Sequence, residues 1–382
     1  MRILITICRY FIGILFIISG LIKANDPVGF SYKLKEYFDV FGWTFFSPMA
    51  LSLSVFITVF EIACGVATLI SYRMRLVTWL LMLMIVFFTF LTFYSAYFNK
   101  VTDCGCFGDA LHLTPWQSFG KDLVLFVFIL PLFILRNRIP GMLSEKISHP
   151  LMLLATLLSL WFNIYCINHL PVIDFRPYKI GTDIKKARAI PPGAPQDVFE
   201  SRVVYLNKKT GEKKEFTAQE LGKASYLWED TATWKWDTTI NKLISEGYKP
   251  PIHDFTISNP DGNDITDSIL STPGFTFLLV AYDINKSDKE VQPMINALVA
   301  SCDKARIPFV GLSASTSGMV DKFRHENQSM FPYYFVDETA LKTMIRSNPG
   351  LILLDQGVVK AMWHYNDFPD AEEISKSYGV KF

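Results

Sequence analysis

Five apolar segments in the first half of the 382-residue chain constrain its fold more than any other feature. They lie at about residues 10–23, 48–70, 76–98, 119–135 and 150–169. A helix that crosses the hydrocarbon core of a membrane needs roughly 20 apolar residues, and most of these segments approach or exceed that length. Hydrophobic residues make up 50% of the sequence, which is too apolar for an ordinary soluble protein. The sequence therefore predicts a multi-pass membrane protein in contact with lipid.

The first segment is the shortest, and Arg9 lies at its edge. A long arginine side chain can extend to the membrane surface, so this segment can still cross the membrane as a helix. A cleaved signal peptide is the alternative interpretation of an apolar run near the N-terminus. We disfavour it because no cleavage site built from small residues follows the run.

Basic residues at alternate ends of the segments predict the orientation of the chain. They form three clusters: Arg2 and Arg9; Arg73 and Arg75; and Arg136, Arg138 and Lys146. Cytoplasmic loops are enriched in Lys and Arg, so this pattern places the N-terminus in the cytoplasm. Five crossings then place everything after His169 outside, which is the periplasm for a bacterial inner-membrane protein. The formal net charge of +1 gives no indication of a nucleic-acid partner.

A short loop between the third and fourth segments reads Asp103-Cys104-Gly105-Cys106-Phe107-Gly108-Asp109. Glycine allows a sharp bend that can bring the two sulfurs together. A disulfide across one residue closes a very small ring, so it removes little entropy from the unfolded chain. Such a ring is strained and easily reduced, which favours a redox pair in an oxidising compartment. A structural disulfide stays open as an alternative, as does a metal site with His112 and Asp103 or Asp109.

Glu61 lies inside the second apolar segment, where a carboxylate is costly to bury. Such a residue usually faces the interior of a helical bundle and is protonated or paired. Lys23 is a candidate partner, although its position in the sequence places it nearer the outer face. We interpret Glu61 as a proton relay or a quinone contact, with a structural hydrogen bond as the alternative.

Three further cysteines lie in the apolar segments. Core packing is the default for Cys8 and Cys64, because free cysteine is among the most buried residue types. Cys166 differs because it lies near the outer end of the fifth segment. It is a candidate resolving thiol for the Cys104 loop, with packing as the alternative.

The second half of the chain is more polar and predicts two regions. Residues 171–250 read as a periplasmic linker with a small β-hairpin at 202–206 and 214–217. Residues 251–382 alternate strand and helix signals, as expected of an α/β sandwich. Strands are predicted at 275–282, 307–312, 350–354 and 358–363, and helices at 289–304, 318–326, 338–345 and 370–378.

Several motifs in the membrane half carry a family resemblance. They are Ser19-Gly20-Leu21-Ile22-Lys23, Asp26-Pro27-Val28-Gly29-Phe30, the segment 33–38, Glu61 with Gly65, and Cys104-Gly105-Cys106-Phe107-Gly108. The helical motifs resemble DoxX-type membrane proteins, and the cysteine motif looks like the signature of the MauE branch. The resemblance implies a four-helix transmembrane domain at 1–140, followed by a fifth tethering helix at 141–170. It also implies redox support for the maturation of disulfide-bearing periplasmic proteins, with possible electron exchange with a quinone.

The C-terminal region resembles thioredoxin-like proteins of the TlpA and peroxiredoxin type. Ser347-Asn348-Pro349-Gly350 falls where that family has its cis-proline loop, which implies a client-binding role for Asn348 and Pro349. If Pro293 aligns with the family's helix proline, Asn285 and Asp288 replace the two thiols of its Cys-x-x-Cys motif. Residues 251–382 therefore resemble a thioredoxin-like domain that binds periplasmic clients without exchanging thiols. Cys302 is predicted to pack in the core.

These observations predict a transmembrane helical bundle followed by an α/β thioredoxin-like domain. The predicted function is thiol–disulfide redox chemistry at Cys104 and Cys106, linked to a quinone near Glu61. One alternative is a membrane-anchored adaptor or complex subunit without redox activity, which the missing Cys-x-x-Cys favours. Another is a small-molecule or ion carrier, which only Glu61 favours.

Overall fold

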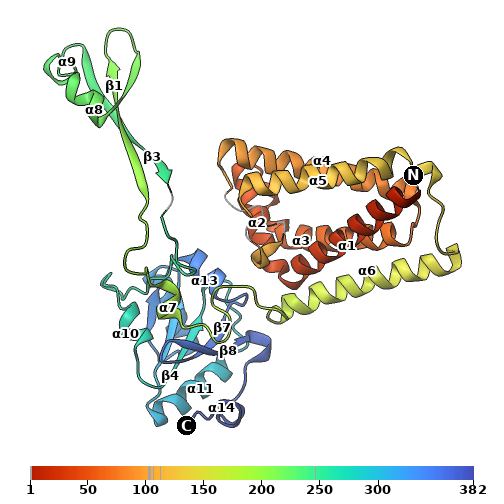
Figure 1. Ribbon diagram of the computed structural model, residues 1–382. Coiled ribbons are helices and arrows are strands. Elements are labelled where there is room, and N and C mark those ends of the chain that lie inside the picture. The colour runs from red at the N-terminus through yellow and green to blue at the C-terminus, as the bar shows by residue number, and fades with distance from the viewer. Residues whose placement is uncertain (1, 102–104, 106, 112, 246) are drawn as a thin grey trace. The chain divides into compact units, whose positions relative to one another are not determined.

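The computed structural model describes residues 2–101, 105, 107–111, 113–245 and 247–382. The chain forms two compact units (Figure 1). The first unit combines Met1–Ile184 with Asp254–Phe382, and the second consists of Lys185–His253. The first unit contains a helical bundle and an α/β domain, and the second contains a small antiparallel sheet.

Five helices in the described part of the chain are long and apolar enough to cross a membrane. They comprise α1 (Arg2–Asn25), η1 (Thr44–Met49) continued by α3 (Ala50–Leu69), α4 (Met74–Phe98), α5 (Pro115–Ile134) and α6 (Glu145–Asn168). All five predicted segments are therefore helical, and the chain is a multi-pass membrane protein. The first helix begins earlier than predicted, so Arg9 lies inside it and not at its edge. Arg9 is 9% exposed and donates a hydrogen bond to Ser71 Oγ at 2.6 Å.

Small residues allow α1 and α3 to pack closely. A side chain at Gly65 would meet the backbone oxygen of Gly13 at 2.9 Å, and one at Gly13 would collide with Leu69. Helix association in lipid relies on such close packing, because water does not drive apolar surfaces together there. Apolar residues of α1, α3, α4 and α5, among them Ile12, Leu81 and Ile129, form the core of the bundle.

An additional helix, α2 (Pro27–Val40), follows α1 directly. The sequence analysis did not predict it, because its residues are too polar for a membrane span. Asp26 caps its N-terminus by accepting a hydrogen bond from Gly29 N, and Pro27 occupies the first turn. Both are ordinary helix-start signals. Ser54 donates to Pro27 O at 2.8 Å and ties α2 to α3.

Loop contacts show which ends of the helices share a side. Met142 N donates to Ile70 O, so the connection from α5 to α6 meets the turn between α3 and α4. At the other end, Asn25 exchanges two hydrogen bonds with the backbone of Ile173, just after α6. The helix ends that the sequence predicts on the same side of the membrane therefore lie at the same end of the bundle. Which side faces the cytoplasm stays a prediction.

The α/β domain has a five-stranded sheet in the order β6-β5-β4-β7-β8. Strands β4 (Phe275–Val280), β5 (Phe309–Ser313) and β6 (Tyr333–Phe335) are parallel, and β7 (Gly350–Asp355) and β8 (Val358–His364) are antiparallel additions. The helices are α10 (Thr266–Leu270), α11 (Gln292–Ala305), α12 (Ser317–Asn327), α13 (Glu338–Met344) and α14 (Ala371–Tyr378). This mixed sheet with helices confirms the predicted α/β domain, and the three-residue strand β6 was not predicted.

Both faces of the central strand are buried. Phe277 and Leu279 join a core that includes Leu298 of α11 and Ile374 of α14. Leu278, which points to the opposite face, is fully buried as well. This pattern explains why β4 reads as a continuous apolar run in the sequence.

The second unit is a three-stranded antiparallel sheet in the order β2-β1-β3. Strands β1 (Val198–Asn207) and β2 (Lys213–Thr217) form the predicted hairpin, and β3 (Trp234–Ser245) pairs along β1. Two short helices, α8 (Ala218–Lys223) and α9 (Tyr226–Glu229), carry Leu227 into a small core with Ala224 and Trp234. A further short helix, α7 (Ile184–Arg188), begins at the last residue of the preceding segment of the first unit. Residues 171–184, which the sequence assigns to the start of the linker region, lie in the first unit.

Candidate functional site

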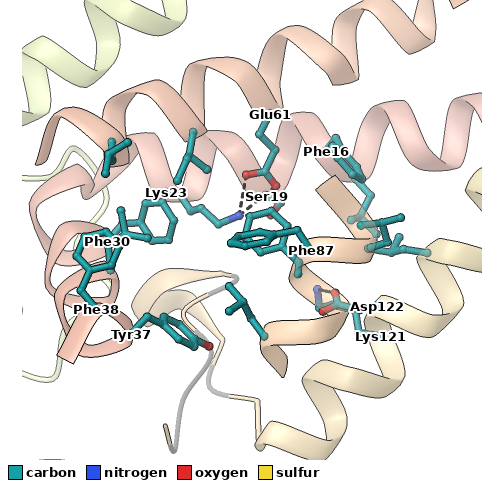
Figure 2. Close-up of a pocket in the computed structure, with 18 of the residues that line it drawn as sticks. Phe16, Ser19, Lys23, Phe30, Tyr37, Phe38, Glu61, Phe87, Lys121 and Asp122 are labelled. Atoms are coloured by element: carbon teal, nitrogen blue, oxygen red, sulfur yellow. Dashed lines mark hydrogen bonds and ion pairs between the residues drawn. The ribbon is translucent and has the colours of Figure 1, made fainter. Parts of the chain in front are cut away.

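The helical bundle encloses an apolar cavity of about 230 Å³ (Figure 2). Its wall combines residues of α1, α2, α3, α4 and α5. The aromatic members are Phe16, Phe30, Tyr37, Phe38, Phe41, Trp43, Phe87 and Phe88. Pockets for drug-sized ligands typically occupy roughly 300–1,000 Å³, so this cavity fits the ring of a small apolar head group better than a large cofactor.

One wall of the cavity carries a buried ion pair between α1 and α3. Lys23 Nζ lies 2.8 Å from Glu61 Oε2 and 3.0 Å from Oε1, and it also donates to Ser19 Oγ at 2.7 Å. The side chains of Lys23 and Glu61 are only 5% and 7% exposed. Lys23, the candidate partner that the sequence suggested for Glu61, thus forms a direct ion pair with it. Because burying either charge alone is costly, each residue requires the other.

The α4–α5 side of the cavity carries a second polar group that the sequence analysis missed. Asp122 of α5 is 1% exposed and accepts a hydrogen bond from Thr92 Oγ1 of α4 at 3.0 Å. Lys121 forms an ion pair with the same carboxylate. Figure 2 shows Lys23 with Glu61 and Lys121 with Asp122 bordering one space from different helices. The sequence signal that could have identified Asp122 is a carboxylate inside an apolar segment.

The described flanks of the cysteine loop contact the wall of the cavity. Val101, just before the loop, is buried with Tyr37 and Leu91, which both line the cavity. On the other flank, the ring of Phe107 lies 5.7 Å from Nζ of Lys121, another lining residue. The predicted site residues Cys104 and Cys106, together with Asp103 and His112, lie outside the described residues. The described residues on both flanks of the loop therefore contact residues that line the cavity.

Four other cysteines are free and buried. Cys8 and Cys64 belong to the core of the bundle, as predicted. Cys166 is 1% exposed near the end of α6. Its predicted role as a resolving thiol depends on its distance from Cys104 and Cys106, which lie outside the described residues. Of the alternative metal ligands, Asp109 forms an ion pair with Arg346 at 2.9 Å.

The α/β domain places its candidate residues away from solvent. Cys302 is fully buried in the core, as predicted, and burial raises the pKa of its thiol to about 12. Asn348 is 8% exposed, and it donates to Asp283 O and accepts from Asp288 N. Pro349, joined to Asn348 by a cis peptide bond, is buried too. The client-binding role predicted for these two residues would require this surface to be uncovered.

Asn285 and Asp288, which replace the two thiols of the Cys-x-x-Cys motif in the resemblance, lie before the helix predicted at 289–304. Asn285 and Asp288 lie in a loop, and α11 begins only at Gln292, with Pro293 in its first turn. Asp283 and Lys286 form an ion pair in this loop at 2.7 Å. A residue at position 285 or 288 therefore does not receive the stabilisation of negative charge that a helix N-terminus provides.

Residues 1–135 match the family model described as methylamine utilisation protein MauE, whereas residues 136–382 lie outside the match. The helical bundle therefore fits a MauE-type membrane protein. This agreement supports the interpretation of the chain as a membrane accessory protein. No curated protein matches the chain.

Proposed function

We propose that this protein is a bacterial inner-membrane thiol–disulfide redox protein that supports the maturation of periplasmic proteins. In this proposal Cys104 and Cys106 cycle between a dithiol and a disulfide, and a quinone in the bundle cavity exchanges electrons with them. The contacts of Val101 and Phe107 with cavity-lining residues support the proposal, because these two residues flank Cys104 and Cys106 in the sequence.

The cavity residues suit an aromatic ring with polar substituents. Phe16, Phe30 and Phe87 offer apolar and aromatic surface, and Lys23 offers N–H donors at one end. Among the described residues, Ser19 and Glu61 accept hydrogen bonds from Lys23, so a ligand carbonyl would compete with Ser19 for one donor. Glu61 and Asp122 are buried carboxylates that can hold or pass a proton.

The redox steps balance with two reactants, a partner protein and the quinone or its quinol, because a quinol must re-reduce the pair after the pair has reduced a partner. One thiolate of the Cys104–Cys106 pair attacks a partner's disulfide, and the second thiol resolves the mixed disulfide, so the partner leaves as a dithiol. In the opposite direction, a partner dithiol reduces the Cys104–Cys106 disulfide. Oxidation of the pair releases two electrons and two protons, which a bound quinone takes up to become a quinol. Residues of the chain position the thiols and hold protons at Glu61 and Asp122.

We infer that the α/β domain is thioredoxin-like and contributes no thiol of its own. The order of its strands and helices, with two antiparallel strands after the parallel ones, supports the likeness. Cys302 is fully buried, and its raised pKa leaves almost no thiolate at neutral pH. Any disulfide exchange therefore falls to the cysteine loop of the bundle.

A second candidate function is a membrane-bound adaptor without redox activity. The observation that favours it is the loop at Asn285 and Asp288, which offers neither thiols nor a helix start. In this case the cysteine loop would be a structural disulfide, and the sheet of the second unit would present the binding surface.

Counting free thiols in membranes tests the redox proposal. The chain has six cysteines, of which Cys8, Cys64, Cys166 and Cys302 are free. After acid trapping and denaturation, a maleimide of high mass should add four tags to the oxidised protein and six after reduction. Cys104→Ser should give five tags in both states, whereas Cys302→Ser should give three and five. Six tags at every ambient potential would exclude a redox pair. Full activity of a Cys104→Ser/Cys106→Ser variant in cells would favour the adaptor.

A further inference from the structure

Arg346 links the α/β domain to the flank of the cysteine loop. It lies between α13 and β7 and is 7% exposed. Its guanidinium contacts Asp26 Oδ2 at 2.8 Å and Asp109 Oδ2 at 2.9 Å, and it also donates to Lys342 O. Asp26 caps α2, and Asp109 lies in η2 (Gly108–Ala110), three residues after Cys106 in the sequence.

The surroundings of Arg346 are closely packed. The ring of Tyr32 in α2 lies 5.6 Å from the guanidinium carbon, and Tyr32 OH is 3.4 Å from Tyr282 OH of the α/β domain. A side chain at Gly29 would approach Arg346 Nη2 to 2.7 Å and Asp26 Oδ2 to 2.3 Å, so it would displace the Arg346–Asp26 pair. Burial by itself lowers the pKa of Arg346, but the carboxylates of Asp26 and Asp109 outweigh this effect, so its pKa is raised. Arg346 is therefore a permanent buried cation.

Other contacts hold the same face of the α/β domain in place. Arg176, just after α6, donates to Met344 O, and Asn366 donates to Asn168 O at 2.8 Å. His169 Nδ1 lies 2.7 Å from Asp367 Oδ1. The face next to Asn348 and Pro349 is thus covered by the chain's own membrane half, and this is where a client would be expected to bind.

We propose that Arg346 is a positioning residue for the cysteine loop, acting through Asp109, and that this face of the α/β domain docks the loop of its own chain. The proposal rests on the redox function proposed above. The one cysteine of the domain, Cys302, is fully buried, but the domain supplies a buried cation to Asp109, which follows Cys106 by three residues in the sequence. By pairing with Asp109, Arg346 cancels a carboxylate that would disfavour a nearby thiolate.

Two further charged side chains lie near the described residues of the loop. Lys33 of α2 packs its side chain near Gly105 and pairs with Glu36. Lys121 of α5 lies beside Phe107 and pairs with Asp122. Asp103 belongs to the loop itself and lies outside the described residues. Arg346 balances two carboxylates, those of Asp26 and Asp109.

The test is the pH dependence of thiol alkylation in the reduced full-length protein in detergent. Arg346→Ala leaves Asp109 without its cation, so the pH profile of Cys104 and Cys106 should move to higher pH. At neutral pH the rate should fall about threefold to tenfold. Adding Asp109→Asn to Arg346→Ala should restore the rate, because it removes the unpaired carboxylate. Arg346→Lys should keep part of the rate. Arg202→Ala, which breaks an exposed ion pair of the second unit, is the matched control and should change nothing.

The possible outcomes separate this inference from the redox proposal. Coinciding pH profiles for wild type and Arg346→Ala would overturn the role of Arg346, even if the pair still cycles. If alkylation is slow in Arg346→Ala and adding Asp109→Asn does not restore its rate, Arg346 has only a structural role. This result would overturn the proposal too. If the pH profile of Cys104 and Cys106 shifts as expected but the two thiols never oxidise, the redox function is refuted instead.

Discussion

The helical bundle and the α/β domain bury different kinds of side chain. The bundle surrounds an apolar cavity with the Lys23–Glu61 pair and with Asp122. The α/β domain packs Phe277, Leu279 and their neighbours into an apolar core. Its buried Arg346 lies at the edge that meets the bundle. The polar groups suited to chemistry are thus concentrated in the membrane half and at its boundary.

This contrast is consistent with the proposal that redox chemistry takes place in the bundle and not in the α/β domain. A soluble domain gains stability from burying apolar surface, which needs no charged groups. A membrane helix gains little from that effect, and a charge inside it is retained only when paired or functional. The buried pairs of the bundle therefore mark its site more clearly than any feature of the α/β domain.

The largest expected effect comes from breaking the buried pair. Lys23→Ala leaves Glu61 as an uncompensated charge, which should lower the free energy of unfolding by about 3–5 kcal/mol. Unfolding in mixed micelles by increasing denaturing detergent measures it. Lys33→Ala breaks the half-exposed pair with Glu36 and should cost less than about 1 kcal/mol.

The double variant Lys23→Met/Glu61→Leu separates structure from function. It removes both charges and should recover most of the lost stability. If the pair serves the redox site, this stable variant should still lose quinone-dependent turnover. A stable and fully active double variant would show that the pair is only structural.

The second-largest expected effect is a loss of stability of the α/β domain in acid. His364 is 2% exposed, and burial lowers its pKa to about 4, an effect that His169 strengthens and that Asp367 and Asp288 oppose. Its Nδ1 accepts a hydrogen bond from Asn366 N, which requires the neutral ring. The unfolded chain takes up a proton near pH 6.5, whereas the folded domain does so only near pH 4. Stability should therefore fall as pH drops through this window, by roughly 2–3 kcal/mol.

A thermal-unfolding series between pH 7 and pH 4 would check this window. His364→Gln cannot titrate and should flatten the dependence. An equally steep dependence in that variant would show that groups other than His364 cause it.

The smallest effect distinguishes the two kinds of cysteine. Cys302→Ser places a hydroxyl in an apolar core and should cost about 1–3 kcal/mol without changing thiol exchange. Its neighbour Ser301→Ala should stay within about 0.5 kcal/mol. Cys104→Ser should show the opposite pattern, with little loss of stability and complete loss of exchange. A drop in exchange caused by Cys302→Ser would contradict the division between the two regions.

Residue patterns predicted the elements whose signal is local. The apolar runs identified all five membrane helices, and the strand and helix periods identified most of the α/β domain. Helix α2 escaped because its amphipathic sequence lacks a long apolar run, although Asp26 and Pro27 mark its start. Strand β6 is too short to show a period, and β3 alternates with charged residues that mask it.

The candidate site was only partly predictable, because it depends on contacts distant in sequence. Glu61 stood out as a carboxylate in an apolar helix, and Asp122 carried the same signal but was masked by neighbouring Lys121. Lys23 and Glu61 are 38 residues apart, so their pairing required the packing of α1 on α3. Arg346 lies 237 residues from Asp109, and no local pattern indicates that contact.

The most direct test of the account is the stoichiometry of electron transfer from the cysteine pair. Purified protein, reduced and freed of reductant, would be mixed anaerobically with a short-chain quinone, and quinol formation would be followed by absorbance. The account predicts one quinol per chain, formed together with the loss of two titratable thiols, and none from Cys104→Ser/Cys106→Ser. Equal quinol yields from wild type and the double serine variant, or no quinol from either, would contradict it.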